Sequence, residues 1–134
     1  MNQKRLLFVD DEPAIRETLS LILPRYGFTV TLAASVAEAL EKIQQQEFDI
    51  LLSDLNIEGK RDGYRVVGAM QTSNPSCVTV ILTGYGDPES AVEGRALGID
   101  DYISKPVAPN ELVALLTQKL AAKGAQLHSV ADAG

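Results

Sequence analysis

Acidic residues directly follow two apolar stretches of this sequence. The apolar run at residues 6–9 ends at Asp10 and Asp11, and the run at residues 48–53 ends at Asp54. If these three carboxylates met in the fold, their like charges would raise one another's pKa values strongly. Carboxylate oxygens are the ligands that a hard divalent cation such as Mg²⁺ prefers, and they also suit Mn²⁺. The three aspartates are therefore candidate metal ligands.

A hydroxyl and an ammonium group stand at the ends of two further apolar runs. Thr83 ends one run and is followed by Gly84, whereas Lys105 follows the other and precedes Pro106. Three carboxylates, one Mg²⁺ and the lysine would sum to a net charge of about zero. A carboxylate can accept a phosphoryl group when a cation, a lysine and a hydroxyl bind the phosphoryl oxygens, and Gly84 would leave room for its approach. These groups match phosphoryl transfer to Asp54.

Strand-like and helical patterns alternate along the chain and would bring these groups together. Short β-branched runs indicate strands at residues 5–10, 28–33, 48–53, 78–83 and 101–104. Amphipathic periodicity predicts helices at residues 12–24, 35–46, 63–73, 87–97 and 109–123. Such βα units predict an α/β fold, a flavodoxin-like doubly wound (βα)5 three-layer sandwich with a parallel five-stranded sheet in the order 2-1-3-4-5. All strands would then end at one edge of the sheet, where ligands bind.

Local signals place several element boundaries. Ser35 can cap the second helix, with Glu38 completing a capping box, and Pro24 should end or kink the first helix. Three glycines stand where helices should end: Gly27, Gly98 and Gly124. We therefore expect one folded domain at residues 1–123, followed by a flexible tail or the start of a linker at residues 124–134.

Composition and charge exclude several classes of protein. The chain has 134 residues and a formal net charge of −6 without a lysine or arginine stripe, which argues against nucleic acid or an anionic membrane as a direct partner. No apolar run approaches the roughly 20 residues that span a bilayer, and the polar residues 1–5 argue against a signal peptide. The single cysteine, Cys77, cannot form an internal disulfide. This fits a reducing compartment, and we expect a cytoplasmic protein.

From Lys4 to about Ala122 the sequence resembles a response-regulator receiver domain, the phosphoacceptor module of two-component signalling. The resemblance depends on the joint spacing of five elements: the Asp10–Asp11 pair, Asp54, Thr83, Tyr102, and Lys105 with Pro106. It implies that the acidic pair binds Mg²⁺ and that Asp54 is both a metal ligand and the phosphoacceptor. It also implies that the backbone carbonyl of Asn56 is a further metal ligand.

The same resemblance implies roles for residues at the ends of the last two strands. Thr83 would be the switch hydroxyl, Lys105 the invariant lysine, and the peptide bond before Pro106 would be cis. Tyr102 matches the aromatic residue that turns inward on activation, although a half-buried aromatic at such a position is also typical of a core. Asn56 and Tyr85 occupy the positions that usually set the lifetime of the phosphoryl group.

The sequence departs from the family in the loop after the acceptor. Receivers usually carry a Met-Pro pair there and a glycine eight residues after the acceptor, but this chain reads DLNIEGKRDG, with Gly63 one residue later. Val107 also stands where many members have Phe. The conformation of the loop and the surface beside the switch should therefore differ from those of a typical receiver.

Partners also follow from the resemblance. A sensor histidine kinase or a phosphotransfer protein would supply the phosphoryl group, and the surface formed by the fourth helix, fifth strand and fifth helix would change and support a homodimer. Ala14, Thr18 and Leu21 form an outward stripe on the first helix, which is either a kinase-docking surface or a scattered set of surface residues. The chain would not be an enzyme beyond Mg²⁺-dependent self-phosphorylation and slow self-dephosphorylation.

Other functions on the same fold fit the residues less well. An FMN binder needs a neutral loop after the first strand, where this chain has DDEP. A dehalogenase-type phosphatase needs a second aspartate two residues after the nucleophile, where this chain has Asn56, which cannot act as a general acid. Asp11 or Glu12 alone would serve as a helix cap. The alternative that we retain is a phosphorylation-independent protein-interaction module.

Overall fold

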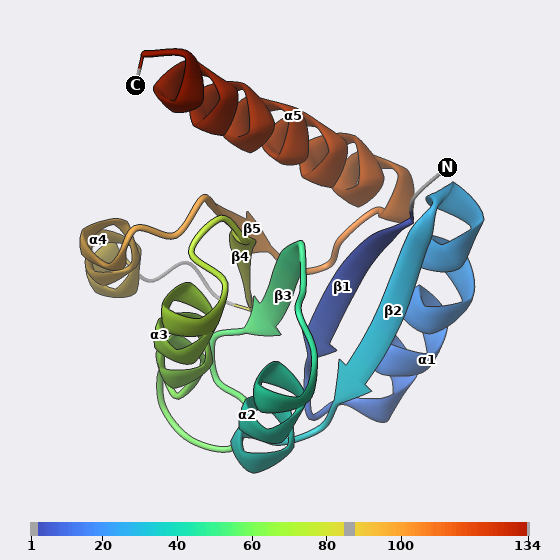
Figure 1. The fold of residues 1–134 in the computed structure, drawn as a ribbon. Coiled ribbons are helices and arrows are strands. Elements are labelled where there is room, and N and C mark those ends of the chain that lie inside the picture. The colour runs from blue at the N-terminus through green and yellow to red at the C-terminus, as the bar shows by residue number, and fades with distance from the viewer. Residues whose placement is uncertain (1–2, 85–87, 134) are drawn as a thin grey trace.

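Five parallel strands form the central sheet (Figure 1). The computed structural model describes residues 3–84 and 88–133. The strands are β1 (Lys4–Val9), β2 (Phe28–Ala33), β3 (Ile50–Asp54), β4 (Val78–Thr83) and β5 (Asp101–Ser104). Their order in the sheet is β2-β1-β3-β4-β5, which confirms the predicted flavodoxin-like topology.

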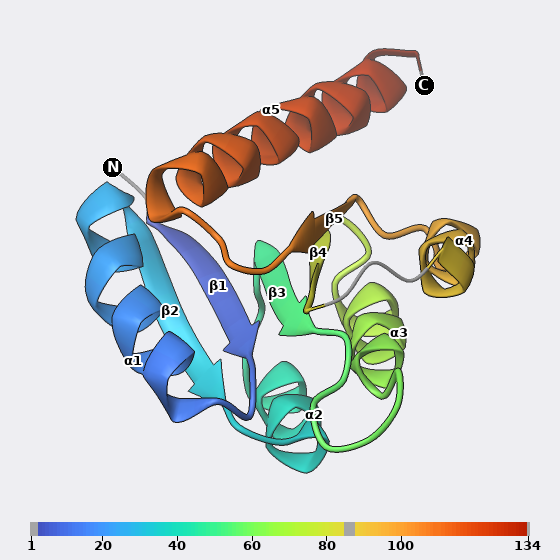
Figure 2. The same cartoon turned by 180° about the vertical axis from the view of Figure 1, so that it is seen from behind.

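Helices cover both faces of this sheet. They are α1 (Pro13–Ile22), the 3₁₀ turn η1 (Leu23–Tyr26), α2 (Val36–Gln45), α3 (Gly63–Ser73), α4 (Pro88–Leu97) and α5 (Pro109–Ala133). Successive side chains of a strand point to opposite faces, so Leu7 and Val9 pack with α2 and α3, whereas Leu6 and Phe8 pack with α1 and α5. Figures 1 and 2 show α2 and α3 on one side of the sheet and α1 on the other.

Several predicted boundaries are confirmed by the backbone. The α1 helix ends at Ile22, two residues before Pro24, and the chain continues as the 3₁₀ turn η1. Gly27 follows that turn with a left-handed φ of 93°, a conformation that a side chain would disfavour. The Ser35 hydroxyl accepts a hydrogen bond of 3.1 Å from the Glu38 N–H at the start of α2.

The final helix is longer than its sequence pattern predicted. We expected it to end near residue 123, with Gly124 as its stop signal, but α5 continues to Ala133. A glycine inside a helix costs about 1 kcal/mol relative to alanine, and the helix-forming Ala, Lys, Gln and Leu around Gly124 outweigh that cost. The division into a domain at residues 1–123 and a tail or linker after it stays a prediction. Among the described residues, no helix is both long and apolar enough to cross a membrane.

The register of the sheet aligns the strand ends that carry polar residues. Val9 pairs with Ser53, so Asp10 and Asp54 leave neighbouring strands at the same level. Asp54 in turn pairs with Leu82, one residue before Thr83. Because the strands are parallel, these carboxyl ends meet at one edge of the sheet, and the chemistry is concentrated there.

Candidate metal centre

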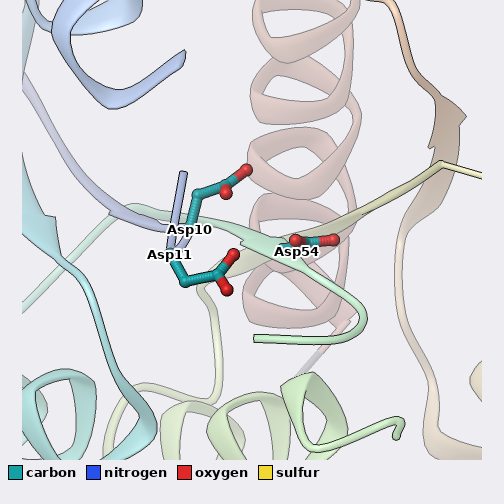
Figure 3. Close-up of side chains that lie close together, drawn as sticks. All are labelled: Asp10, Asp11 and Asp54. Carbon is teal, nitrogen blue, oxygen red and sulfur yellow. The ribbon is translucent and has the colours of Figure 1, made fainter. Parts of the chain in front are cut away.

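Three carboxylates gather at this edge of the sheet. Asp10, Asp11 and Asp54 each offer an oxygen atom, and these atoms all lie within 4.8 Å of one another. Figure 3 shows Asp10 and Asp11 extending from the end of β1 toward the side on which Asp54 lies. Asp10 is fully buried and Asp54 nearly so, whereas Asp11 is exposed to solvent. This all-oxygen donor set, open on the side of Asp11, fits a hard divalent cation such as Mg²⁺.

Asp10 is held in place by contacts on each of its polar groups. Its Oδ1 accepts a hydrogen bond of 2.9 Å from the Glu12 N–H, and its backbone carbonyl accepts one of 2.6 Å from the Arg16 guanidinium. Its Oδ2 lies 2.9 Å from the Lys105 ammonium. A buried carboxylate is tolerated when it is paired and hydrogen-bonded in this way. Asp10 is therefore a rigid member of the cluster.

Lys105 connects the carboxylates to the end of β5. Its Nζ lies 2.9 Å from Asp10 Oδ2 and 3.4 Å from Asp54 Oδ2. The backbone N–H of Lys105 donates a hydrogen bond of 2.8 Å to the Thr83 carbonyl, and the Lys105–Pro106 peptide bond is cis. Burial acts to lower the pKa of Lys105, but the hydrogen bond to Asp10 and the charges of Asp10 and Asp54 outweigh it and raise that pKa. The ammonium therefore stays charged beside the two acids.

The pKa of Asp54 depends on burial and on its charged neighbours. Burial is the main cause that raises the pKa of Asp54 above its ordinary value. The charge of Lys105 lowers that pKa, the charge of Asp10 raises it, and the net direction is upward. A divalent cation among the three acids would favour the ionised form of Asp54, since an opposite charge nearby stabilises a carboxylate. The donor set and its charge both fit a metal ion.

Thr83 and Gly84 lie beside the acidic cluster at the end of β4. Thr83 is the last residue of β4, is nearly buried and pairs with Ser104. Gly84 is exposed, and a Cβ placed on it would meet no atom within 4 Å among the described residues. Within residues 3–84 and 88–133, the space beside the Gly84 Cα is therefore open. Tyr85, a predicted lifetime-setting residue, lies outside the described residues.

The unusual loop after Asp54 is organised by Asp62, a residue that our sequence reasoning missed. Its carboxylate accepts hydrogen bonds from the N–H groups of Ile57 at 2.6 Å, Glu58 at 2.9 Å and Gly59 at 2.8 Å. Carboxylates commonly accept hydrogen bonds from neighbouring backbone groups in turns. The sequence signal that could have indicated this role was an acidic residue in a loop that contains glycine. Asp62 thus orders the loop by accepting hydrogen bonds from three of its N–H groups.

Asn56 and Arg61 complete the loop. The Asn56 side-chain oxygen accepts a hydrogen bond of 2.7 Å from the Arg61 N–H. Arg61 has a φ of 59°, a left-handed conformation that is uncommon outside glycine. This tight turn accommodates the extra residue that separates Asp54 from Gly63. It leaves Asn56 exposed directly after Leu55, beside the acidic cluster.

Replacing Asp62 by alanine should destabilise the domain. Three backbone N–H groups would lose their acceptor, and we expect the free energy of unfolding to fall by about 1–3 kcal/mol. Urea denaturation measures the change, and Lys60→Ala in the same loop is the matched control, because the Lys60 side chain is exposed. Equal stability of the two variants would contradict the role of Asp62 in ordering the loop.

The sheet order and the acidic edge with its lysine together define a receiver-like α/β domain. The family model of the response regulator receiver domain matches residues 6–117. The chain belongs to this family.

Similar proteins agree with this assignment. The alginate biosynthesis transcriptional regulatory protein AlgB of Pseudomonas putida is 37% identical over 111 residues, which are 83% of this chain and 25% of that protein. The response regulator protein PilR of Pseudomonas aeruginosa is 32% identical over 120 residues, which are 90% of this chain and 27% of that protein. The chain thus spans about a quarter of the length of each relative.

Solved structures show the same fold. A receiver domain protein from Methanospirillum hungatei superposes with a TM-score of 0.87 at 31% identity, covering 93% of this chain and 99% of that one. A response regulator from Burkholderia pseudomallei superposes with a TM-score of 0.80 at 27% identity, covering 92% of this chain and 72% of that one. The Burkholderia structure contains a phosphorylated aspartic acid, a calcium ion and citrate.

Proposed function

We propose that this chain is the phosphoacceptor domain of a two-component response regulator and takes a phosphoryl group onto Asp54. The observation that carries the proposal is the lysine–aspartate arrangement, in which Lys105 Nζ lies 2.9 Å from Asp10 and 3.4 Å from Asp54, beside oxygens suited to a metal. A phosphorylated aspartic acid and a divalent cation occur together in the similar Burkholderia protein. The donor would be the phosphohistidine of a sensor kinase or of a phosphotransfer protein.

Asp10, Asp11, Asp54 and the backbone carbonyl of Asn56 would hold Mg²⁺, or Mn²⁺ in its place. When bound, the ion supplies positive charge that neutralises the phosphoryl oxygens. An oxygen of Asp54 attacks phosphorus in line, so the new O–P bond forms while the N–P bond of the donor breaks and its electron pair leaves with the histidine. Lys105, already 3.4 Å from Asp54, then contacts one phosphoryl oxygen, and Thr83 donates a hydrogen bond to another.

The new contacts would change the surface of α4, β5 and α5. Thr83 moves toward the phosphoryl group, Tyr102 turns further into the space beside it, and the altered surface binds the next partner or a second copy of the chain. Moving such an equilibrium from mostly off to mostly on requires about 5 kcal/mol of differential binding. Charge-assisted hydrogen bonds contribute roughly 1.5–3 kcal/mol each, so a few of them suffice.

A cleft beside the candidate centre is a suitable docking place for the phosphoryl donor. It has a volume of about 470 Å³ and lies between α1 and the segment after β5. Ala14 and Thr18 line it from α1, and Pro106 and Val107 line it from the other side. Lys105 also lines this cleft, so a partner bound there would reach the site of transfer. Leu21 extends the exposed stripe on α1, with 64% of its surface accessible.

Incubation with acetyl phosphate and Mg²⁺ tests the proposal. We expect the intact mass to increase by one phosphoryl group, because acetyl phosphate offers a good leaving group to the same nucleophile. Omitting the metal with EDTA present should prevent the gain, since the three acids then remain uncompensated. A chain that gains no mass in the presence of Mg²⁺ would instead be a phosphorylation-independent interaction module.

A further inference from the structure

The start of α3 contacts the backbone of Asp54 and also Tyr102 of β5, which belongs to the surface of α4, β5 and α5. A Cβ placed on Gly63 would lie 2.2 Å from the Asp54 carbonyl oxygen, and the Gly63 N–H donates a hydrogen bond of 2.8 Å to the Leu55 carbonyl. The backbone of Gly63 therefore packs directly against the backbone of Asp54. Any movement of the acceptor loop must move the beginning of α3 with it.

Tyr64, the next residue, contacts Tyr102, the aromatic residue that is predicted to turn inward on activation. The hydroxyl groups of Tyr64 and Tyr102 share a hydrogen bond, although the two residues are 38 positions apart in the sequence. Tyr64 is nearly buried, and burial followed by the hydrogen bond to Tyr102 raises its pKa above the ordinary value. The Tyr64 hydroxyl thus stays protonated at neutral pH, and the contact persists as a neutral hydrogen bond.

The α4 helix closes over this pair of tyrosines. A Cβ placed on Gly94 would lie 2.7 Å from Tyr102 Cε2 and 3.0 Å from the Tyr64 hydroxyl. Gly94 is buried in the middle of α4, where a glycine is otherwise unfavourable, so its lack of a side chain makes room for the tyrosines. The position of α4 is therefore coupled to the arrangement of Tyr64 and Tyr102.

Arg61 provides a second contact with α4 from the same segment. Its guanidinium lies 3.0 Å from Glu93 Oε2, and its backbone N–H binds the Asn56 side chain at 2.7 Å. The Arg61–Glu93 pair is partly exposed and contributes less than the tyrosine pair, of which Tyr64 is nearly buried. Both contacts nevertheless connect residues 61–64, which follow the loop after Asp54, to α4 and β5.

We infer that residues 61–64 form a second route by which the state of Asp54 reaches the α4–β5 surface, in addition to Thr83. The inference rests on the proposed function. Arg61 and Tyr64 act as positioning residues, because they touch Glu93 and Tyr102 rather than the reacting atoms. By reciprocity, if a phosphoryl group at Asp54 favours these contacts, the contacts favour its binding to the same extent.

Beryllofluoride with Mg²⁺ mimics a phosphoryl group on a carboxylate and tests the inference without turnover. The readout is the change in the Gly94 amide signal of the ¹⁵N-labelled protein on saturation, together with the beryllofluoride affinity. In Tyr64→Phe we expect affinity to fall by about 3-fold or more and the Gly94 change to shrink, because coupling free energies of this kind correspond to several-fold effects. Glu93→Gln should act in the same direction but more weakly.

Matched controls separate coupling from simple loss of structure. Tyr26→Phe alters an exposed tyrosine in η1, and Glu41→Gln alters an exposed glutamate on α2, so both should leave affinity and the Gly94 change unaltered. In Thr83→Val, part of the Gly94 change should remain at saturating beryllofluoride, and adding Tyr64→Phe should remove it. Loss of ligand-free stability alone would not change the size of the signal change at saturation.

Three outcomes would overturn the inference. Unaltered affinity and Gly94 change in both Tyr64→Phe and Glu93→Gln would contradict it and leave the proposed function standing. Complete loss of the Gly94 change in ligand-bound Thr83→Val would show that Thr83 is the whole route. A wild-type chain that does not respond to beryllofluoride and Mg²⁺ would contradict the proposed function and the inference together.

Discussion

Asp54→Asn is expected to abolish the mass gain that the wild-type chain shows with acetyl phosphate and Mg²⁺. An amide is far less nucleophilic than a carboxylate, so no oxygen at position 54 can form the bond to phosphorus. The substitution keeps the shape of the side chain at the end of β3. Intact mass spectrometry over time measures both the extent and the rate of the gain.

The stability of this variant distinguishes loss of chemistry from loss of fold. Burial, with a smaller contribution from the charge of Asp10, raises the pKa of Asp54 by more than the charge of Lys105 lowers it, so the ionised Asp54 is unfavourable in the folded protein. A raised pKa means that ionisation at neutral pH reduces stability, so the uncharged Asn should leave the metal-free protein equally or more stable. Thermal unfolding without metal should therefore show an unchanged or higher midpoint for Asp54→Asn.

Asp49→Asn is the matched control, because Asp49 directly precedes the same strand at the opposite edge of the sheet. Asp49 accepts a hydrogen bond from the Arg5 N–H, which an asparagine oxygen can also accept. Its phosphorylation rate should stay close to that of wild type, because residue 49 lies at the opposite end of β3 from Asp54. A mass gain that persists in Asp54→Asn would assign the acceptor to another residue.

The residues of the candidate site could be predicted because each one ends a strand or directly follows one. In a parallel sheet all carboxyl ends share one edge, so Asp10, Asp54, Thr83 and Lys105 had to meet if the runs before them were neighbouring strands. That conclusion needs the strand order but no knowledge of any loop. Right-handed crossovers leave only a few such orders, and 2-1-3-4-5 is the commonest of them for five strands. The fold and the position of the acidic cluster were therefore readable from local patterns.

Contacts between loops and distant elements were not readable in this way. Asp62 binds three backbone groups of its own loop, but whether it does so depends on the left-handed turn at Arg61, which no local pattern predicts. The bond between Tyr64 and Tyr102 depends on how α3 and β5 pack together, and so does the close approach of both tyrosines to Gly94 of α4. The predicted helix end at Gly124 was wrong because it relied on the low helix propensity of one glycine. The residues around Gly124 favour a helix, and α5 continues through it.

Gly63→Ala is expected to cause the largest loss of stability among the substitutions considered. Its new Cβ would lie 2.2 Å from the Asp54 carbonyl oxygen and 2.9 Å from the Leu55 carbonyl oxygen, and both are backbone atoms that cannot rotate away. The start of α3 or the end of β3 must therefore move. Overpacking of this kind costs typically 1–3 kcal/mol and occasionally more, and a backbone clash this close places Gly63→Ala at about 3 kcal/mol or above. Urea denaturation measures the loss.

Gly68→Ala in the same helix provides a control of opposite sign. A Cβ on Gly68 would meet no atom within 4 Å in the part of the chain that the structure describes, and Gly68 lies inside α3. Alanine there should raise the free energy of unfolding by about 0.5–1 kcal/mol, because glycine loses more conformational freedom in a helix. The same added methyl group is thus expected to destabilise the protein at position 63 and to stabilise it at position 68. Similar effects of the two substitutions would show that α3 does not pack against the Asp54 backbone, and the route inferred for residues 61–64 would lose its anchor.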